Sequence, residues 1–476
     1  MKQQEFIQKI QAQKDYILQS VNNDEWRNAY HLMAPIGWIN DPNGLCYFKG
    51  EYHVFYQYSP LNANGGLKFW GHYTSKDLVN WTEHDVALYP DIAEDIDGVY
   101  SGSAIVHNDE MYLIYTGNVK HTDGDYDYIL SGREQNVIVV KSSDGYHFSD
   151  KTVVLRNEDY PSNMGLHVRD PKVWKEDDTF YMVLGARSVD DQGYVLLYQS
   201  KDLFNWEYVS TPAGGLDGMG YMWECPDLVK INNQDVFIFS PQGLDSEGYK
   251  YQNVYQSGYA LASFDESKQH LALGEFIELD RGFDFYAPQT FVDEQERVIM
   301  IGWMGVPDAV EHVNPTVEKG WQHALTLPRE LKLINNKLYQ VPVEELKSLR
   351  KDETKMSDLV LGDEVSLELF QSHTFELKAE FSQMTAFKLG LRHDCELVFD
   401  KGVFTLSLGR SGYGRDARSV EIDAISELTI YSDQSVLEIY LNGGEEVFTT
   451  RIYNEGHDTQ LSVSGNGSLT LTKWEL

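Results

Sequence analysis

Three carboxylates stand at matching places in three similar stretches of this sequence. Asp41 lies in GWINDPNG, Asp170 in VRDPKV and Glu224 in WECPDL. Clustered acids can bind a metal ion, or they can act as a pair in which one donates a proton while another attacks a carbon centre or activates water. Asp-Pro-Asn-Gly is also what a β-turn requires, so for Asp41 taken alone a turn former is the better interpretation.

These stretches belong to a repeat with a period near 60 residues. Five segments, each with an apolar strand, a polar turn and a second apolar strand, start at residues 41, 101, 170, 224 and 287. SKDLVNW at 75–81 returns as SKDLFNW at 200–206, and SSDGYHF at 142–148 is a looser copy. Sheet units that repeat in this way without intervening helices are typical of a β-propeller, so we predict five blades around a channel.

The repeat changes the interpretation of Asp41. If the first strand of each blade is innermost, then Asp41, Asp170 and Glu224 converge at one end of the channel. Pro42 and Pro171 disfavour helical backbone at the aspartates before them, so we expect both aspartates to be extended. A mere turn former has no reason to recur at the same blade position. The sequence therefore predicts that Asp41 is a turn residue and a site residue together.

Metal binding fits these residues less well than acid–base chemistry does. The segments lack the closely spaced acids of a calcium loop, and the spacing of His31, His53 and His72 matches no metal motif. H-E-x-x-H, G-x-S-x-G and P-loop patterns are also missing from the sequence. We expect no metal and no cofactor.

Paired carboxylates flanked by aromatic residues suit the cleavage of glycosidic bonds. Aromatic rings near the blade openings could stack on sugar rings, although each by itself would also suit the propeller core, and nearby amides could bind hydroxyl groups. Two neighbouring anions and apolar surroundings should raise the pKa of the third acid. The aromatic residues are Trp38, Trp70, Trp223, Tyr286 and Trp303, and the amides are Asn40, Gln57 and Gln289.

The motifs WINDPNG, VRDPKV and WECPDL, in this order, resemble the three signature motifs of glycoside hydrolase family 32, the invertase family. FYQYSP, KFWGHYTSKDLVNW, YSGSA and DFYAPQT resemble its supporting motifs, and the similarity runs from His31 to residue 331. It implies a retaining β-fructofuranosidase whose substrate is sucrose-6-phosphate, sucrose or a short fructo-oligosaccharide. The loop SPLNANGGLKFWGH departs from the family pattern, which leaves the leaving-group side of the pocket open.

The same resemblance implies a role for each site residue. Asp41 would be the nucleophile, Glu224 the general acid/base and Asp170 a stabiliser of the transition state. Arg169 would position Asp170 or the sugar, and Cys225 would tune the neighbouring Glu224. The remaining substrate-binding residues would be Asn40, Gln57, Trp70, Ser101, Tyr286 and Trp303.

Length and composition limit the other possibilities. The chain has 476 residues, enough for two domains, and a formal net charge of −35, which opposes binding to nucleic acid or to an anionic membrane surface. The N-terminal segment lacks the apolar core of a signal peptide, and the three scattered cysteines form no disulfide framework. We expect a cytoplasmic protein whose partner is a small sugar, and the sequence does not indicate its oligomeric state.

We predict four segments along the chain. An amphipathic helix occupies residues 1–25, the five-bladed propeller 26–340, a partly helical linker 341–360 and an antiparallel β-sandwich 361–476. The last prediction rests on alternating apolar and polar residues broken by Gly and Asn turns. YSDQSVLEIYLNGG in this part could bind sugar, but a structural role in the sandwich is the better interpretation, and we place no catalytic residue there.

Four alternatives stay open. An arabinan-cleaving relative would invert configuration and hold its acids farther apart. A fructosyltransferase would make kestose-type products, and an intracellular fructo-oligosaccharide hydrolase would show the same motifs. A carbohydrate-binding protein without activity belongs to another class, and the presence of all three carboxylates argues against it.

Overall fold

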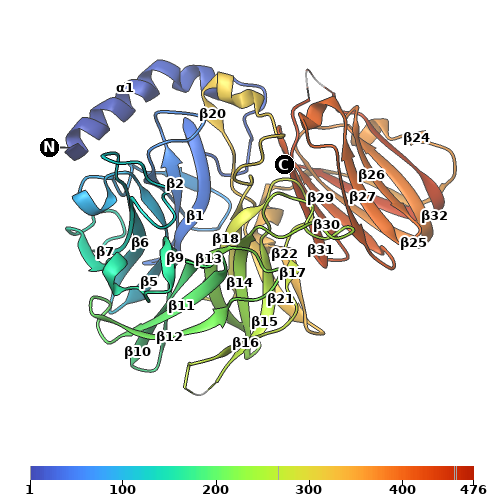
Figure 1. The fold of residues 1–476 in the computed structure, drawn as a ribbon. Helices are drawn as coiled ribbons and strands as arrows, with labels where there is room; N and C mark the ends of the chain where they lie inside the picture. Colours follow the sequence, from blue (N-terminus) through green and yellow to red (C-terminus); the bar gives the residue numbers. More distant parts are fainter. Residues whose placement is uncertain (1, 266, 455, 457) are drawn as a thin grey trace.

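The computed structural model describes residues 2–265, 267–454, 456 and 458–476, and it has two β-rich domains preceded by a helix (Figure 1). Helix α1 (Lys2–Asn22) lies against the first domain. Its residues Ile10 and Val21 are buried, and the ring of Phe6 packs edge-on against Phe69 with 5.1 Å between centroids. The helix therefore docks through the apolar stripe of its amphipathic sequence.

Five sheets surround a common channel in the first domain and follow one another along the chain (Figure 1). Each first strand contacts the first strand of the next sheet, and the last contacts the first, so these strands form a closed ring. The five-bladed propeller is thus confirmed, and the first strand of each blade is innermost. These inner strands are β1 (Gly37–Phe48), β5 (Val99–His107), β9 (Met164–Glu176), β13 (Met222–Ile231) and β18 (Tyr286–Val292).

The remaining strands of each blade pair outward from the inner strand. Blade 1 continues with β2 (Glu51–Ser59), β3 (Phe69–Ser75) and β4 (Trp81–Glu83), and blade 2 with β6 (Glu110–Lys120), β7 (Arg133–Ser142) and β8 (Thr152–Leu155). Blade 3 continues with β10 (Thr179–Ser188), β11 (Gly193–Ser200) and β12 (Trp206–Gly214). Blade 4 contains β14 (Gln234–Gln242), β15 (Gly258–Phe264), β16 (Leu271–Leu273) and β17 (Ile277–Glu278), and blade 5 contains β19 (Val298–Trp303), β21 (Arg329–Ile334) and β22 (Lys337–Pro342).

A short strand after blade 5's second strand ties the ring to its start. Strand β20 (Trp321–Gln322) pairs in parallel with Gly37 and Trp38 of β1. The Gly37 N–H also donates a 2.8 Å hydrogen bond to the Gly320 carbonyl. Because these contacts join residues almost 300 positions apart, they help to hold the first and last blades together.

Apolar side chains fill the spaces between neighbouring blades. Between blades 1 and 2, for example, Phe55 and Trp70 pack with Leu113 and Tyr115, and all four are fully buried. Aromatic and β-branched residues favour such pleated, two-sided packing. The same residue types that produce the strand pattern in the sequence therefore also build the inter-blade cores.

A β-bulge occurs near the start of every inner strand. In each blade the register places two residues of the inner strand opposite one residue of the second strand. The bulged pairs are 40–41, 100–101, 170–171, 225–226 and 287–288. Three of the pairs end in proline, which lacks an N–H for the ladder and is tolerated at bulges. Bulges redirect side chains, and here they do so at one end of the channel.

One bulge corrects an expectation about the backbone. Asp170 has a φ of +62°, and Cys225 and Ala287, at the equivalent bulges, have φ values of +47° and +48°. Asp170 is therefore in the left-handed region. The proline that follows it had suggested an extended conformation, and that expectation was wrong. The bulge imposes this conformation, which is uncommon for residues other than glycine.

The second domain is an antiparallel β-sandwich-like sheet region, as predicted. Strand β25 pairs with β29 through its first half and with β26 through its second half, while β32 runs along its other edge. The enclosed core includes Leu377, Leu397 and Phe448. The strands are β23 (Lys351–Leu361), β24 (Val365–Ser366), β25 (Phe375–Leu391), β26 (Cys395–Asp400), β27 (Val403–Leu408), β28 (Ala417–Glu421), β29 (Glu427–Ser432), β30 (Val436–Leu441), β31 (Glu446–Arg451) and β32 (Leu461–Glu475).

The segment between the domains differs from the partly helical linker expected over 341–360. A 3-10 helix covers Glu344–Leu349, but Lys351–Leu361 is strand β23, which pairs with β32 of the sandwich. Five further 3-10 helices are present among the described residues. They are η1 (Ala93–Asp95), η2 (Asn157–Asp159), η3 (Pro315–Lys319), η5 (Glu368–Phe370) and η6 (Arg410–Gly412).

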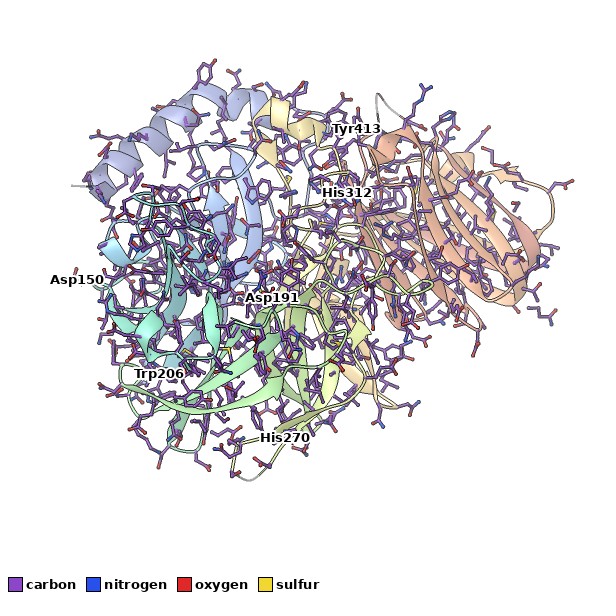
Figure 2. All side chains as sticks on the ribbon, in the orientation of Figure 1. Asp150, Asp191, Trp206, His270, His312 and Tyr413 are labelled. Atoms are coloured by element: carbon purple, nitrogen blue, oxygen red, sulfur yellow. The ribbon has the colours of Figure 1, made fainter. Side chains whose placement is uncertain are left out.

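Buried ion pairs join the two domains. Arg329 of the propeller bonds to Glu438 of the sandwich at 2.6 Å, and Asp284 of the propeller is held by Arg415 and Arg451 of the sandwich at 2.7 and 2.8 Å. His312 and Tyr413, labelled in Figure 2, mark the place where the domains meet. Since removing one partner of a buried pair costs about 3–5 kcal/mol, these contacts fix how the domains sit against each other.

His31, just before blade 1, adds a pH-dependent contact to this interface. Its two ring nitrogens lie 3.0 Å from Asp433 Oδ2 and 3.1 Å from Glu438 Oε1, and all three side chains are fully buried. Burial alone would lower the pKa of His31, but the hydrogen bonds and charges of the two carboxylates outweigh it and raise the pKa to about 9. The charged form of His31 therefore stabilises the folded protein.

His31→Gln should lower the free energy of unfolding at pH 6 by about 3 kcal/mol, which is the value of a shift of this size. The raised pKa means that the contribution is complete below about pH 6.5 and is lost as the pH rises through about 9. Urea unfolding of both proteins at pH 6 and pH 10 should show the difference shrinking. His147→Gln, at a surface histidine, is the control, and an equal loss for His31→Gln at both pH values would contradict the ion-pair interpretation.

None of the helices in the described part of the chain is long and apolar enough to cross a membrane.

Candidate active site

A cavity of about 410 Å³ opens where the inner strands begin, and residues from all five blades line it. This volume is within the range of small-molecule sites. Its lining combines carboxylates, amides, cations and indole rings. The lining residues are Trp38, Asn40, Asp41, Gln57, Lys68, Tyr100, Ser101, Arg133, Arg169, Asp170, Glu224, Gln242, Tyr286, Trp303, Pro307 and Asp308.

Asp41 is held by a closed ring of hydrogen bonds. Ser101 Oγ donates to Asp41 Oδ2 at 2.5 Å, and Asn40 Nδ2 donates to Asp41 Oδ1 at 2.9 Å. Gln57 completes the ring, because its Nε2 donates to Ser101 Oγ and its Oε1 accepts from Asn40 Nδ2, both at 2.6 Å. Burial raises the pKa of Asp41, and the bonds from Ser101 and Asn40 partly oppose that shift. The ring fixes the carboxylate in one orientation.

Asp170 lies beside Asp41 and is the most deeply buried of the three acids. The Cys225 N–H donates to Asp170 Oδ2 at 3.0 Å, and the Cys225 Sγ lies 3.7 Å from Asp170 Oδ2 and 3.9 Å from Asp41 Oδ2. Burial raises the pKa of Asp170 well above its ordinary value, with the Arg169 charge opposing and the Glu224 charge adding to the shift. The pKa is therefore raised at two of the three acids, Asp170 and Asp41.

Glu224 accepts four hydrogen bonds, two at each of its carboxylate oxygens. Arg169 donates to Oε1 through Nε at 3.0 Å and through its terminal nitrogen at 2.6 Å. The other oxygen, Oε2, accepts from Gln242 Nε2 at 2.8 Å and from the Tyr286 hydroxyl at 2.7 Å. One oxygen thus faces a cation and the other faces neutral donors, of which the tyrosine hydroxyl can also accept a hydrogen bond.

Two indole rings form an apolar wall. Trp38 and Trp303 lie 5.9 Å apart between ring centroids, and Tyr286 lies edge-on to Trp303 at 6.4 Å. The Trp38 Nε1 donates to Asn40 Oδ1 at 2.8 Å, which connects the wall to the ring of bonds around Asp41. Such a wall suits the apolar face of a sugar ring, while the amides beside it suit the hydroxyl groups.

The structure brings nine of the eleven site residues predicted from the sequence into the cavity. Two predicted substrate-binding residues do not line it. Trp70 is fully buried between blades 1 and 2, where its Nε1 donates to the Tyr100 carbonyl at 3.0 Å, so its placement in the sugar pocket was wrong. Cys225 lies beneath the carboxylates and contacts them from behind.

Two other residues considered for sugar binding are also structural. Trp223 is fully buried against Phe239 at 4.6 Å between centroids. Gln289 is buried and donates to the Gly102 carbonyl at 2.9 Å. In both cases packing within or between blades takes the side chain away from the cavity.

Sequence reasoning missed six lining residues. Tyr100 sits next to Ser101 in the blade 2 bulge, and Gln242 lies across from Met222 at the start of blade 4, so a full strand register would have found both. Lys68 directly precedes β3 and Arg133 begins β7, each after a loop, and Pro307 and Asp308 lie in a loop. No sequence motif marks any of these four residues.

No group of three or more His, Cys, Asp and Glu side chains among the described residues is arranged to hold a metal ion.

Two carboxylates in different hydrogen-bond environments face an aromatic-walled cavity of sugar size, at the open end of a five-bladed propeller. This combination defines a carbohydrate-cleaving enzyme. The chain belongs to glycosyl hydrolase family 32, whose N-terminal domain matches residues 31–342 and whose C-terminal domain matches residues 345–475. The family resemblance seen in the motifs is thereby confirmed.

Individual relatives cover nearly the whole chain. A sucrose-6-phosphate hydrolase of Bacillus subtilis is 42% identical over 96% of this chain and 95% of its own length. The solved structure of a sucrose-6-phosphate hydrolase from Lactobacillus gasseri superposes with a TM-score of 0.88 at 30% identity, over 99% of this chain and 97% of that one. A GH32 β-fructofuranosidase of Bombyx mori gives a TM-score of 0.85 at 33% identity, over 99% and 97%.

Proposed function

We propose that this glycoside hydrolase is a retaining β-fructofuranosidase that cleaves sucrose-6-phosphate, and sucrose as a second substrate. The observation that carries the proposal is the contrast between Asp41, fixed by Ser101 and Asn40, and Glu224, whose Oε2 has neutral partners. We infer the substrate from the Bacillus subtilis and Lactobacillus gasseri relatives, which are sucrose-6-phosphate hydrolases. A solved structure of a mutant of the Bombyx mori enzyme in complex with sucrose supports the sugar class.

In the first step Asp41 attacks the anomeric carbon C2 of the fructosyl unit. The ring of hydrogen bonds presents its carboxylate without a change of rotamer, so little reorganisation is needed in the transition state. The bond from C2 to the glycosidic oxygen breaks as the bond from C2 to Asp41 forms, which leaves a covalent fructosyl–enzyme intermediate.

Glu224 protonates the departing glycosidic oxygen in the same step. Oε2 is the oxygen suited to carry that proton, because Oε1 faces the Arg169 guanidinium. The Tyr286 hydroxyl can turn to accept a hydrogen bond from protonated Oε2. In the second step water attacks C2 while the Glu224 carboxylate takes a proton from it. The bond from C2 to Asp41 breaks, which regenerates the Asp41 carboxylate and releases fructose.

Asp170 and Arg169 act on the sugar and on the other two acids. Asp170 is placed to accept hydrogen bonds from fructose hydroxyls, and such bonds strengthen as the ring gains positive charge in the transition state. Arg169 lies 4.0 Å from Asp170 and bonds to Glu224, so it links the stabiliser to the acid/base.

A phosphorylated sugar does not diffuse across membranes, so this substrate assigns the enzyme to the cytoplasm.

The substrate is tested by measuring kcat/KM for sucrose-6-phosphate, sucrose and 1-kestose with the purified full chain. We expect sucrose-6-phosphate to be preferred. Equal or better use of 1-kestose would instead make the protein a fructo-oligosaccharide hydrolase. Failure to release fructose from any of them would overturn the β-fructofuranosidase proposal.

The stereochemistry needs a separate measurement, because free fructose equilibrates between anomers. Methanol can intercept the covalent intermediate, and proton NMR identifies the product. Methyl β-fructofuranoside is the expected product of a retaining enzyme. Methyl α-fructofuranoside would contradict double displacement through Asp41.

A further inference from the structure

Two cationic side chains line the cavity without a carboxylate partner. Lys68 and Arg133 are half-buried in the lining, and neither forms an ion pair with any described residue. The third cation of the cavity, Arg169, is already bound to Glu224. Unpaired cations are unusual in a protein with a net charge of −35, and the mechanism above uses neither of them.

Lys68 and Arg133 belong to one continuous stretch of the wall, with Tyr100 between them. A Cβ atom placed on Gly98 would lie 2.8 Å from Tyr100 Cε1 and 3.5 Å from Lys68 Cβ, so Tyr100 and Lys68 are neighbours across that glycine. On the other side, Tyr100 and Arg133 are close enough for each to influence the pKa of the other. We refer to Lys68, Tyr100 and Arg133 as the basic arc.

Arg133 has free hydrogen-bond donors at the site. Its Nε is buried and has no acceptor among the described residues. Burial lowers the pKa of Arg133, and the nearby positive charge of Arg169 lowers it further. Both effects would be relieved by an anion bound to the guanidinium, whose planar fork matches phosphate oxygens.

Lys68 is poised in a similar way. Its ammonium group lies over the Trp38 ring, 4.8 Å from the centroid. Burial lowers its pKa to about 7, and the charge of Asp41 only partly opposes the shift. A phosphate beside Lys68 would favour its charged form.

Arg133 places one end of the basic arc on the leaving-group side of the cavity. Arg133 and Gln135 lie two residues apart on β7, and Gln135 Oε1 accepts a 3.4 Å hydrogen bond from Arg169. Arg169 in turn bonds to Glu224, which protonates the leaving group in the mechanism above. The exposed carboxylate of the lining, Asp308, comes from the loop between β19 and β20 and accepts a hydrogen bond from the Tyr255 hydroxyl. Local cations are what an anionic substrate needs to approach so acidic a protein.

We propose that Arg133 and Lys68 recognise the phosphate group on the leaving glucosyl unit and thereby set the preference for the phosphorylated substrate. The inference rests on the proposed function, because it presupposes that sucrose-6-phosphate is a substrate. Arg133 is the principal donor, since its guanidinium offers two parallel N–H groups, and Lys68 adds a second charge.

The test compares kcat/KM for sucrose-6-phosphate with kcat/KM for sucrose in the wild type and in Arg133→Gln, Arg133→Lys and Lys68→Met. We expect the ratio to fall about 10- to 100-fold in Arg133→Gln, which is typical for loss of a charged hydrogen bond. Arg133→Lys should restore part of the ratio, because it keeps the charge but not the fork. Arg156→Gln, which removes an arginine paired with Glu94 outside the cavity, is the matched control and should keep the wild-type ratio.

Inhibition of sucrose hydrolysis by glucose-6-phosphate and by glucose is a second readout of the same contacts. Glucose-6-phosphate should inhibit the wild type more strongly than glucose does, and Arg133→Gln should reduce that difference. The melting temperature of each variant shows whether it is folded.

Each failure has a distinct meaning. A wild type that does not prefer sucrose-6-phosphate overturns the proposed substrate, and the inference with it. A wild type that prefers it, with folded variants that keep the preference, overturns the inference alone. Variants that lose activity on both substrates equally would show that Arg133 and Lys68 support the site without reading the phosphate, which also overturns it.

Discussion

Asp41→Asn is expected to reduce kcat for fructose release by at least about 10⁴-fold, because the amide cannot form the covalent bond to C2. Asn has nearly the same shape as Asp, and the Ser101 hydroxyl can still donate to its carbonyl oxygen. Substrate binding should therefore survive. The turnover number is measured by fructose release, and binding by the change in tryptophan fluorescence, since Trp38 and Trp303 line the cavity.

The control for this variant is Asp85→Asn, at an exposed aspartate on the outside of blade 1. It removes the same charge and should leave kcat unchanged. The mass of the Asp41→Asn protein must be measured to exclude deamidation of the new Asn back to Asp. If the intact variant retains more than a tenth of the wild-type kcat, another group is the nucleophile.

Glu224→Gln should reduce kcat for sucrose-6-phosphate about 10²- to 10⁴-fold, the usual contribution of a general acid. The loss in kcat/KM, which covers the steps up to formation of the intermediate, should be much smaller for 4-nitrophenyl β-fructofuranoside, whose leaving group departs without a proton. Hydrolysis of the intermediate would still be slow, since the same residue activates water. Azide, which needs no general base, should then restore turnover of the nitrophenyl substrate and yield fructosyl azide.

Two checks accompany this result. Glu207→Gln, at an exposed glutamate of blade 3, is the matched control for the loss of charge. Glu224→Gln also removes the nearer of the two anions beside the buried Arg169 guanidinium, so the melting temperature must be measured to separate unfolding from lost chemistry. Equal losses in kcat/KM for good and poor leaving groups would mean that Glu224 does not donate the proton.

The repeat in the sequence was sufficient to predict the propeller. Each blade contributes the same order of apolar strands and polar turns, so the period is visible even where residues differ. Asp41, Asp170 and Glu224 stand at the starts of their repeats, within two residues of one another in the register of the inner strands. Ring closure of the inner strands then brings these strand starts together. A prediction of convergence needed no knowledge of side-chain geometry.

Residue type did not distinguish site tryptophans from core tryptophans. Trp70 and Trp303 both occur near blade openings, but Trp70 lies between blades and Trp303 lines the cavity. Both environments are apolar. Only the packing of neighbouring blades decides whether a tryptophan side chain faces the cavity or the space between blades. The segment around Lys351 shows a similar limit, because its strand conformation depends on pairing with β32, more than 100 residues farther along the chain.

The sequence by itself determined the blade number, the sandwich and the three acids, since these depend on local alternation and on a repeated position. Only the tertiary structure decided how the acids are aimed and what surrounds them. The bulges place Asp170 and Cys225 in left-handed backbone. Arg133 reaches the cavity from the third strand of blade 2 and Gln242 from the second strand of blade 4. Such contacts join residues that are distant in the chain, and their geometry depends on the register and packing of whole sheets, which no short motif encodes.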